Sequence, residues 1–153
     1  MKKIEIISES NSYSAVNIGN LNSLQNYSFL HPKTGLEVRG KVFLKEPTKA
    51  TGTEISFQTL AAKSDLSYFH KHIENEETYI ILKGSEFFQV DEDCFPIKEG
   101  SVVRIAPATK RGFCNTSYDQ MILAVIQSKE GSLNQYSSDD GERVIIEPKW
   151  RNK

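Results

Sequence analysis

Hydrophobic and polar residues alternate along most of this chain, in short runs that are separated by turn-forming residues. A period of two is typical of β-strands, because successive side chains of a strand point to opposite faces of the sheet. Segments such as DEDC (91–94), KEG (98–100) and NTSYD (115–119) supply the turns. The pattern predicts strands over residues 36–44, 53–60, 77–83, 86–90, 101–105 and 120–127, and a further strand-like run over 143–148.

Many short strands, without a segment of clear helical periodicity, predict an all-β domain of the sandwich or barrel type. The start of the chain differs, because Asn and Ser recur between Ser8 and Ser28 with only isolated apolar residues among them. We therefore expect an irregular N-terminal arm over residues 1–34, packed on the barrel or on a dimer partner. Residues 35–153 are expected to form a single domain.

Composition narrows the function classes. The chain has 153 residues, 38% of them hydrophobic, which suffices for one domain with a buried core. The formal net charge is −1 and the basic residues are scattered, so no basic stripe is present and nucleic acid is not an expected partner. The sequence shows no signal peptide and no run of membrane-spanning length, so we expect a cytoplasmic protein without membrane contact. Cys94 and Cys114 lack CxxC spacing and are expected to be free thiols.

The candidate chemistry begins with two of the three histidines, His70 and His72, which are one residue apart. On a strand they project from the same face, and paired imidazoles are typical of metal sites, although exposed strands also carry such pairs by chance. Glu77 is the preferred third ligand and Glu76 the second choice. Two histidines and one carboxylate form the ligand set of non-haem Fe(II) oxygenases, and this set also holds Mn, Ni, Cu or Zn.

The stretch HKHIENEETYIILKG (70–84) resembles the first signature of the cupin family, which has two histidines, a glutamate five residues after the second and a glycine seven residues later. The stretch GSVVRIAPATKRGFCN (100–115) follows the spacing of the second signature. The resemblance extends over about residues 35–128. It implies a double-stranded β-helix, a cupin jelly-roll barrel with a metal at the base of its pocket, and a homodimer. Cupins include dioxygenases, isomerases, epimerases, decarboxylases, storage proteins and ligand sensors, so the fold implies no particular reaction.

The chain departs from the family pattern at Arg111, which stands where the last histidine ligand is expected, and at Ala108, which replaces a glycine. A guanidinium offers only hydrogen-bond donors and stays charged, so Arg111 cannot be a ligand. Its repulsion of a divalent ion is about 4 kcal/mol per unit of ionic charge at ~4 Å and an effective dielectric of ~20, so metal affinity is expected to be low. Cys114 faces away from residue 111 on a regular strand, and His31 can reach the pocket only if the arm folds over its mouth.

Three interpretations of the pocket stay open at the sequence level, and whether the protein is an enzyme is open with them. In the first, a small anion binds, with Arg111 as a forked donor. In the second, a metal-dependent dioxygenase or isomerase uses the two histidines and the carboxylate, and Arg111 orients an acidic substrate. In the third, a histidine and Tyr79 act as acid and base without metal, as in related sugar epimerases and ketoisomerases. Arg111 can also simply form a structural ion pair with Glu77. The predicted metal ligands are His70, His72 and Glu77, and the predicted binding residues are Arg111, Tyr79, Glu76 and Phe88.

Overall fold

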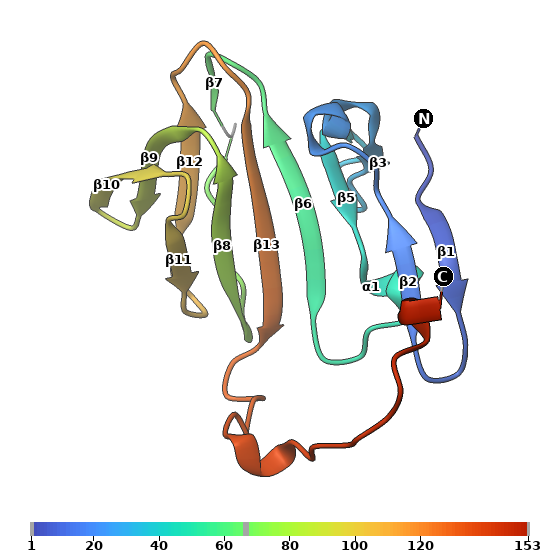
Figure 1. Cartoon of the computed structure of the whole chain (residues 1–153). Helices are drawn as coiled ribbons and strands as arrows, with labels where there is room; N and C mark the ends of the chain where they lie inside the picture. Colours follow the sequence, from blue (N-terminus) through green and yellow to red (C-terminus); the bar gives the residue numbers. More distant parts are fainter. Residues whose placement is uncertain (1, 66–67, 153) are drawn as a thin grey trace.

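The computed structural model describes residues 2–65 and 68–152, and its longer strands are arranged in two antiparallel sheets (Figure 1). The five-stranded sheet has the order β11 (Val102–Ile105), β8 (Asn75–Lys83), β13 (Met121–Lys129), β6 (Glu54–Leu60) and β5 (Lys41–Phe43). The four-stranded sheet has the order β10 (Asp93–Lys98), β9 (Ser85–Val90), β12 (Arg111–Asn115) and β7 (Ser64–Asp65).

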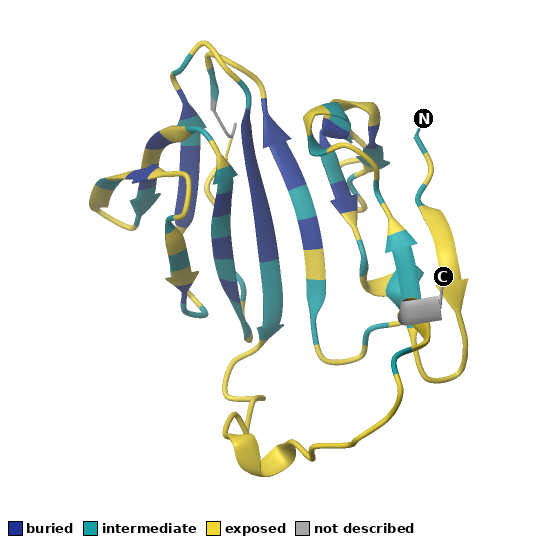
Figure 2. Cartoon of the chain, viewed as in Figure 1, coloured by how far each residue is buried: buried dark blue, intermediate teal, exposed yellow. Residues whose placement is uncertain are grey.

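The main core lies between these two sheets and follows the alternation that the sequence shows. On β8, Glu77, Tyr79 and Ile81 are buried, whereas the residues between them are only partly buried. Figure 2 shows the buried residues concentrated on β6, β12 and β13, with further ones along β8. Each large apolar side chain removed from water contributes roughly 1.5–3 kcal/mol, so this core is the main source of stability. Its buried members are Leu60, Tyr79, Ile81, Phe88, Ile97, Ile105, Phe113, Met121, Leu123 and Val125.

The N-terminal arm carries short elements and packs on the outer face of the five-stranded sheet. These elements are β1 (Glu5–Glu9), β2 (Ser14–Asn17), the 3-10 helix η1 (Leu21–Asn26), β3 (Ser28–Leu30) and β4 (Glu37–Arg39). Leu24 and Tyr27 form a second buried cluster with Val42 and with Ile122 of β13. Because the arm covers this outer face, the first five residues of β13 are buried on both sides of the sheet. The hairpin β3–β4 then continues toward the barrel interior and spans the expected boundary at residue 34.

Two predicted strands differ from the structure. The run 36–44 is divided at Gly40, whose φ of 79° allows a sharp change of direction, so β4 pairs with β3 while β5 joins the five-stranded sheet. The run 143–148 forms no strand, and its residues Val144, Ile145 and Ile146 are 69%, 90% and 77% exposed. The physical reason is that this segment has no neighbouring strand within the described part of the chain, and an unpaired strand is unstable in water.

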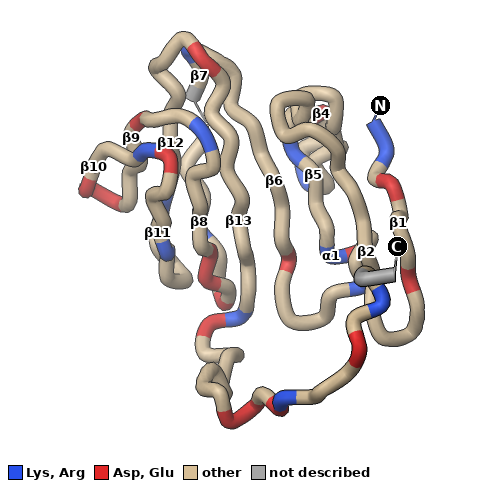
Figure 3. Tube along the Cα trace, in the orientation of Figure 1, with Lys and Arg blue, Asp and Glu red and all other residues tan. Residues whose placement is uncertain are grey.

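The remaining elements are short. They are the helix α1 (Lys45–Thr48) and the 3-10 helices η2 (Ser138–Asp140) and η3 (Lys149–Asn152). Among the described residues, no helix has the length and apolar character needed to cross a bilayer. Acidic and basic residues are both spread over the length of the trace (Figure 3).

Candidate functional site

The two closely spaced histidines lie beside the start of β12, on a segment that is held by backbone hydrogen bonds. His70 forms an isolated antiparallel bridge with Arg111, with N–O distances of 3.3 and 3.1 Å. The carbonyl of His72 accepts a hydrogen bond of 2.7 Å from the backbone N–H of Ala108. This extended backbone directs both imidazoles to the same side, with ring centroids 5.5 Å apart. The predicted pairing of His70 and His72 on one face is therefore present in the structure.

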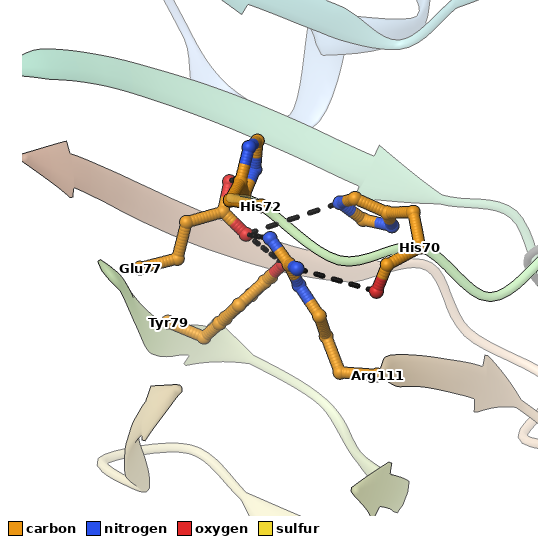
Figure 4. Close-up of polar contacts among 5 residues, drawn as sticks. All are labelled: His70, His72, Glu77, Tyr79 and Arg111. Atoms are coloured by element: carbon orange, nitrogen blue, oxygen red, sulfur yellow. Dashed lines mark hydrogen bonds and ion pairs between the residues drawn. The ribbon is translucent and has the colours of Figure 1, made fainter. Parts of the chain in front are cut away.

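Glu77 projects from the inner face of β8 toward the two histidines, as Figure 4 shows. Its Oε1 lies 3.0 Å from His72 Nε2, and its Oε2 lies 3.9 Å from His70 Nε2. One potential ligand atom from each of the three residues lies within 4.8 Å of the others. The spacing of the first motif thus converges on a group that can hold a metal ion.

Arg111 enters this group from β12 and is almost fully buried, with 1% of its surface exposed. Its Nη2 forms an ion pair with Glu77 Oε2, and its Nη1 donates a hydrogen bond of 3.2 Å to the carbonyl of His70. Its Nε donates to the hydroxyl of Tyr79 at 3.2 Å, and that hydroxyl donates to Glu77 Oε2 at 2.5 Å (Figure 4). Arg111 and Tyr79 therefore both contact the same carboxylate oxygen.

This arrangement changes the titration of the buried groups. Burial acts to raise the pKa of Glu77, but the hydrogen bonds from Tyr79 and Arg111 and the charge of Arg111 outweigh it, so the pKa falls below its ordinary value of 4.5. Burial, and then the charge of Arg111, lower the pKa of His70 to about 4. Burial raises the pKa of Tyr79, and the Glu77 charge adds to this effect. At neutral pH the group therefore contains an ionised Glu77, a charged Arg111 and a neutral His70.

A cavity of about 620 Å³ adjoins this group, and His70 and Tyr79 form part of its wall. The hairpin β3–β4 supplies a second wall, so the arm does fold over the pocket and brings His31 to its lining. His31 Nδ1 accepts hydrogen bonds of 3.3 Å from the backbone N–H groups of Lys33 and Thr34, and His31 lies outside the cluster of possible metal ligands. The complete lining is Phe29, His31, Thr34, Leu36, Glu37, Val38, Arg39, Lys41, Gln58, Thr59, Leu60, Tyr68, His70, Tyr79 and Phe113.

Comparison with known proteins decides the family. No family model matches the chain, and no curated protein matches it. Among solved structures, a cupin protein from Bacteroides fragilis is 34% identical over 69% of this chain and 89% of its own, with a TM-score of 0.66. The chain belongs to the cupin family.

Two further structures show the same cupin fold. A protein with a double-stranded β-helix domain from Klebsiella pneumoniae is 13% identical over 72% of this chain and 90% of its own, with a TM-score of 0.53. A predicted oxalate decarboxylase from Thermotoga maritima is 22% identical over 67% of this chain and 90% of its own, with a TM-score of 0.55. The predicted double-stranded β-helix is therefore confirmed.

In this cupin the two histidines suit a metal ion, whereas the surroundings of Glu77 Oε2 do not. His70 Nδ1 and His72 Nε2 are buried and have no hydrogen-bond partner in the described part of the chain. His72 Nε2 lies close to Glu77 Oε1, but the two atoms do not form a hydrogen bond, because the ring nitrogen is not directed at that oxygen. This geometry is expected when both atoms face a common point that a metal ion can occupy. On the other side, Glu77 Oε2 is already bound by Arg111 and Tyr79. The three ligands suit a metal, whereas the cation at position 111 opposes it.

Of the four residues predicted to bind a ligand, only Tyr79 lines the cavity, and Arg111 is committed to its contacts beside it. Glu76 is on the outer side of β8 and pairs with Arg104, whose Nε donates to its Oε2 at 2.7 Å. Phe88 is fully buried in the aromatic core, with ring centroids 5.1 Å from Tyr79 and 5.7 Å from Phe113. A side chain committed to such packing has no surface to offer to a ligand.

The sequence predicted few of the residues that line the cavity, and the polar residues Lys41 and Gln58 are among those that were missed. On β6 the apolar residues Ile55 and Phe57 point outward, whereas Ser56 and Gln58 are buried toward the barrel. A strand whose polar face is buried indicates a lined cavity, but the alternation alone does not reveal which face is inside. Lys41 shares this ambiguity, because it is the register partner of Gln58.

Proposed function

We propose that this cupin binds a small anionic organic molecule in its barrel cavity and holds divalent metal ions only weakly. The observation that supports the proposal is the buried ion pair between Arg111 and Glu77. In this pair a guanidinium takes the role of countercharge to the carboxylate, which a metal ion would otherwise have. The cavity beside the pair then serves an organic ligand.

The charge balance around the cavity favours an anion. Glu77 pairs with Arg111, and Glu37 pairs with Arg39 at 3.2 Å, so these four charges compensate one another. Lys41 lines the cavity and has no ion pair with any residue in the ranges 2–65 and 68–152. One positive charge is therefore left over, and in a site that is partly shielded from water it attracts an anion more strongly than at an exposed surface.

Calorimetric titration and thermal-shift measurements with small carboxylates, inorganic phosphate and neutral analogues of the same size test the proposal. We expect at least one anion to bind with a stoichiometry of one per chain, and the neutral analogues to bind more weakly. In parallel, elemental analysis of protein purified without added metal should give clearly less than one metal ion per chain. Equal binding of neutral and anionic probes would contradict the proposed function.

A second candidate is a metal-dependent oxygenase or isomerase, and one observation favours it. Buried imidazole nitrogens without partners are unusual, and His70 and His72 each have one. A metal ion held with Glu77 would give His72 Nε2 a partner. A stoichiometric transition metal that resists dialysis would place this candidate first.

A further inference from the structure

Lys41 lies on the inner face of the five-stranded sheet, at its β5 edge. Register pairs place it beside Gln58, Gln58 beside Leu123, and Leu123 beside Ile81, so the four residues form one row across the sheet. Ile81 and Leu123 are fully buried in the core, whereas Gln58 and Lys41 reach the cavity. The row therefore changes from apolar to polar where the cavity begins.

The ammonium group of Lys41 lacks a polar partner in the structure. It forms no hydrogen bond and no ion pair within the described ranges of the chain, and its Nζ lies 5.0 Å from the ring centroid of Phe43. Burial lowers the pKa of Lys41, the charge of Glu77 opposes this effect, and the charge of Arg111 adds to it. A partly buried cation without a counterion is unfavourable, since it has lost water and gained only a weak contact with an aromatic ring. A bound anion removes this penalty.

The other residues that line the cavity indicate which chemical groups the anion has besides its charge. Leu60 and Phe113 line the cavity from the barrel, and Phe29, Leu36 and Val38 line it from the hairpin β3–β4. A volume of about 620 Å³ falls within the range of roughly 300–1,000 Å³ that is typical of small-molecule sites. Apolar walls of this extent suit an aromatic or aliphatic body rather than a compact, fully hydrated ion such as phosphate.

The number of free charges favours a monoanion. The guanidinium of Arg111 already contacts Glu77, Tyr79 and the His70 carbonyl. Arg39 is paired with Glu37. Neither guanidinium therefore has two free N–H groups to donate to a phosphate. A single ammonium with the neutral amide of Gln58 beside it matches one carboxylate.

We propose that Lys41 is the anchoring residue of the cavity and that the ligand is a monocarboxylic acid with an apolar body. The carboxylate binds the Lys41 ammonium with Gln58 adjacent to it, and the body packs against Phe29, Leu36, Leu60 and Phe113. This inference rests on the proposed function, because it assigns the chemistry of the same anion-binding cavity.

The test uses 3-phenylpropionate and hexanoate, the primary amides of both acids, citrate and inorganic phosphate, each titrated into the 153-residue chain. We expect the two acids to bind at least tenfold more tightly than their amides. Lys41→Met should weaken binding of the acids at least tenfold and leave binding of the amides unchanged. Lys45→Met is the matched control, because Lys45 is exposed on α1 and outside this cavity, and it should bind like the original protein.

A measurement on the unmodified protein covers the case in which Lys41→Met does not fold. Acetic anhydride labelling, read by peptide mass spectrometry, should modify Lys41 more slowly when 3-phenylpropionate or hexanoate is present, with Lys45 as the internal reference. Equal labelling of Lys41 with and without a bound acid would overturn the inference.

The remaining outcomes separate this inference from the proposed function. If citrate or phosphate binds and the apolar acids do not, the inference is wrong and the proposed function stands. The same holds if the acids bind equally well to the original protein and to Lys41→Met. If none of the anions binds, both are wrong.

Discussion

The barrel contains two inward-facing cations, and they differ in their surroundings. Arg111, on the four-stranded sheet, has an ion pair with Glu77 and hydrogen bonds to Tyr79 and the His70 carbonyl. Lys41, on the opposite sheet, has the ring of Phe43 nearby and no polar partner in the described part of the protein. A cation whose donors are satisfied within the protein contributes to the fold, whereas one without partners is available to a ligand. We therefore expect the two cations to differ in how they affect stability and binding.

The largest effect is expected for the paired cation. Arg111→Met leaves the buried carboxylate of Glu77 without its counterion, so the free energy of unfolding should fall by roughly 3–5 kcal/mol. The double substitution Glu77→Gln with Arg111→Met removes both charges and should recover part of this loss. Chemical unfolding with urea measures both variants.

The control for this prediction is Arg104→Met, which removes an exposed ion pair with Glu76. Its effect on stability should be much smaller, because exposed pairs are screened by water. Equal losses for the two arginine variants would show that the Arg111 pair is not a special element of the fold.

The next prediction concerns the replacement of Arg111 by a residue that can bind a metal. Arg111→His removes the charge that opposes a metal and supplies an additional imidazole beside His70, His72 and Glu77, so the affinity for Zn, Ni or Mn should rise at least tenfold. Adding His72→Ala in the same background should cancel the gain, since it removes one of the converging ligands. Titration calorimetry on the three proteins makes the measurement. Unchanged affinity in Arg111→His would mean that another group already fills the ligand position.

For the unpaired cation the opposite effect on stability is expected. Lys41→Met removes a partly buried ammonium that lacks a counterion, so the ligand-free protein should be as stable as the original or more stable, by up to about 1 kcal/mol. Urea unfolding without added ligand checks this. A loss of stability comparable to that of Arg111→Met would erase the distinction between the two cations.

A further effect is a pH dependence of stability that arises beside Arg111. The pKa of His70 is about 4 in the folded protein, below its ordinary value of 6.5, so the unfolded chain binds more protons between these two values. Stability should therefore decrease as the pH falls from 6.5 toward 4. Below pH 4.5 the contribution of Glu77, whose pKa is also lowered, should be lost as well. Thermal unfolding across this range should show a shallower decrease for His70→Gln than for the original protein.

The first half of the site could be predicted because its information is local. His70, His72 and Glu77 lie within eight positions of one another, and strand alternation with one turn suffices to bring them together. The alternation also predicted most strands of the five-stranded sheet. Strand β10 was not predicted, and its first two residues were assigned to the turn over 91–94. Pro96 weakens the strand signal, and the structure tolerates this proline since β10 is at the edge of its sheet.

The second half of the site depends on contacts between distant segments. The pairing of Arg111 with Glu77 joins residues on different sheets, and the sequence left it as one of several alternatives. The roles of Lys41 and Gln58 depend on which face of a strand is inside, and that is set by the arm packing on the other face. The tail residues 143–148 have a strand-like composition, but a strand needs a neighbour and none is present within residues 2–65 and 68–152.

The predicted homodimer is independent of this comparison and stays a prediction. Light scattering should give a mass of about twice the 17.3 kDa of one chain. A mass of one chain over a wide range of concentrations would contradict it.

The hairpin β3–β4 has a consequence for how this protein can change over evolutionary time. It supplies Phe29, His31, Leu36 and Val38 to the cavity, yet its strands belong to neither of the two large sheets. Mutations in residues 28–39 can therefore alter what the cavity accepts while the folding core stays as it is. A library confined to these twelve positions would therefore be a direct way to change the ligand preference that we propose for the cavity.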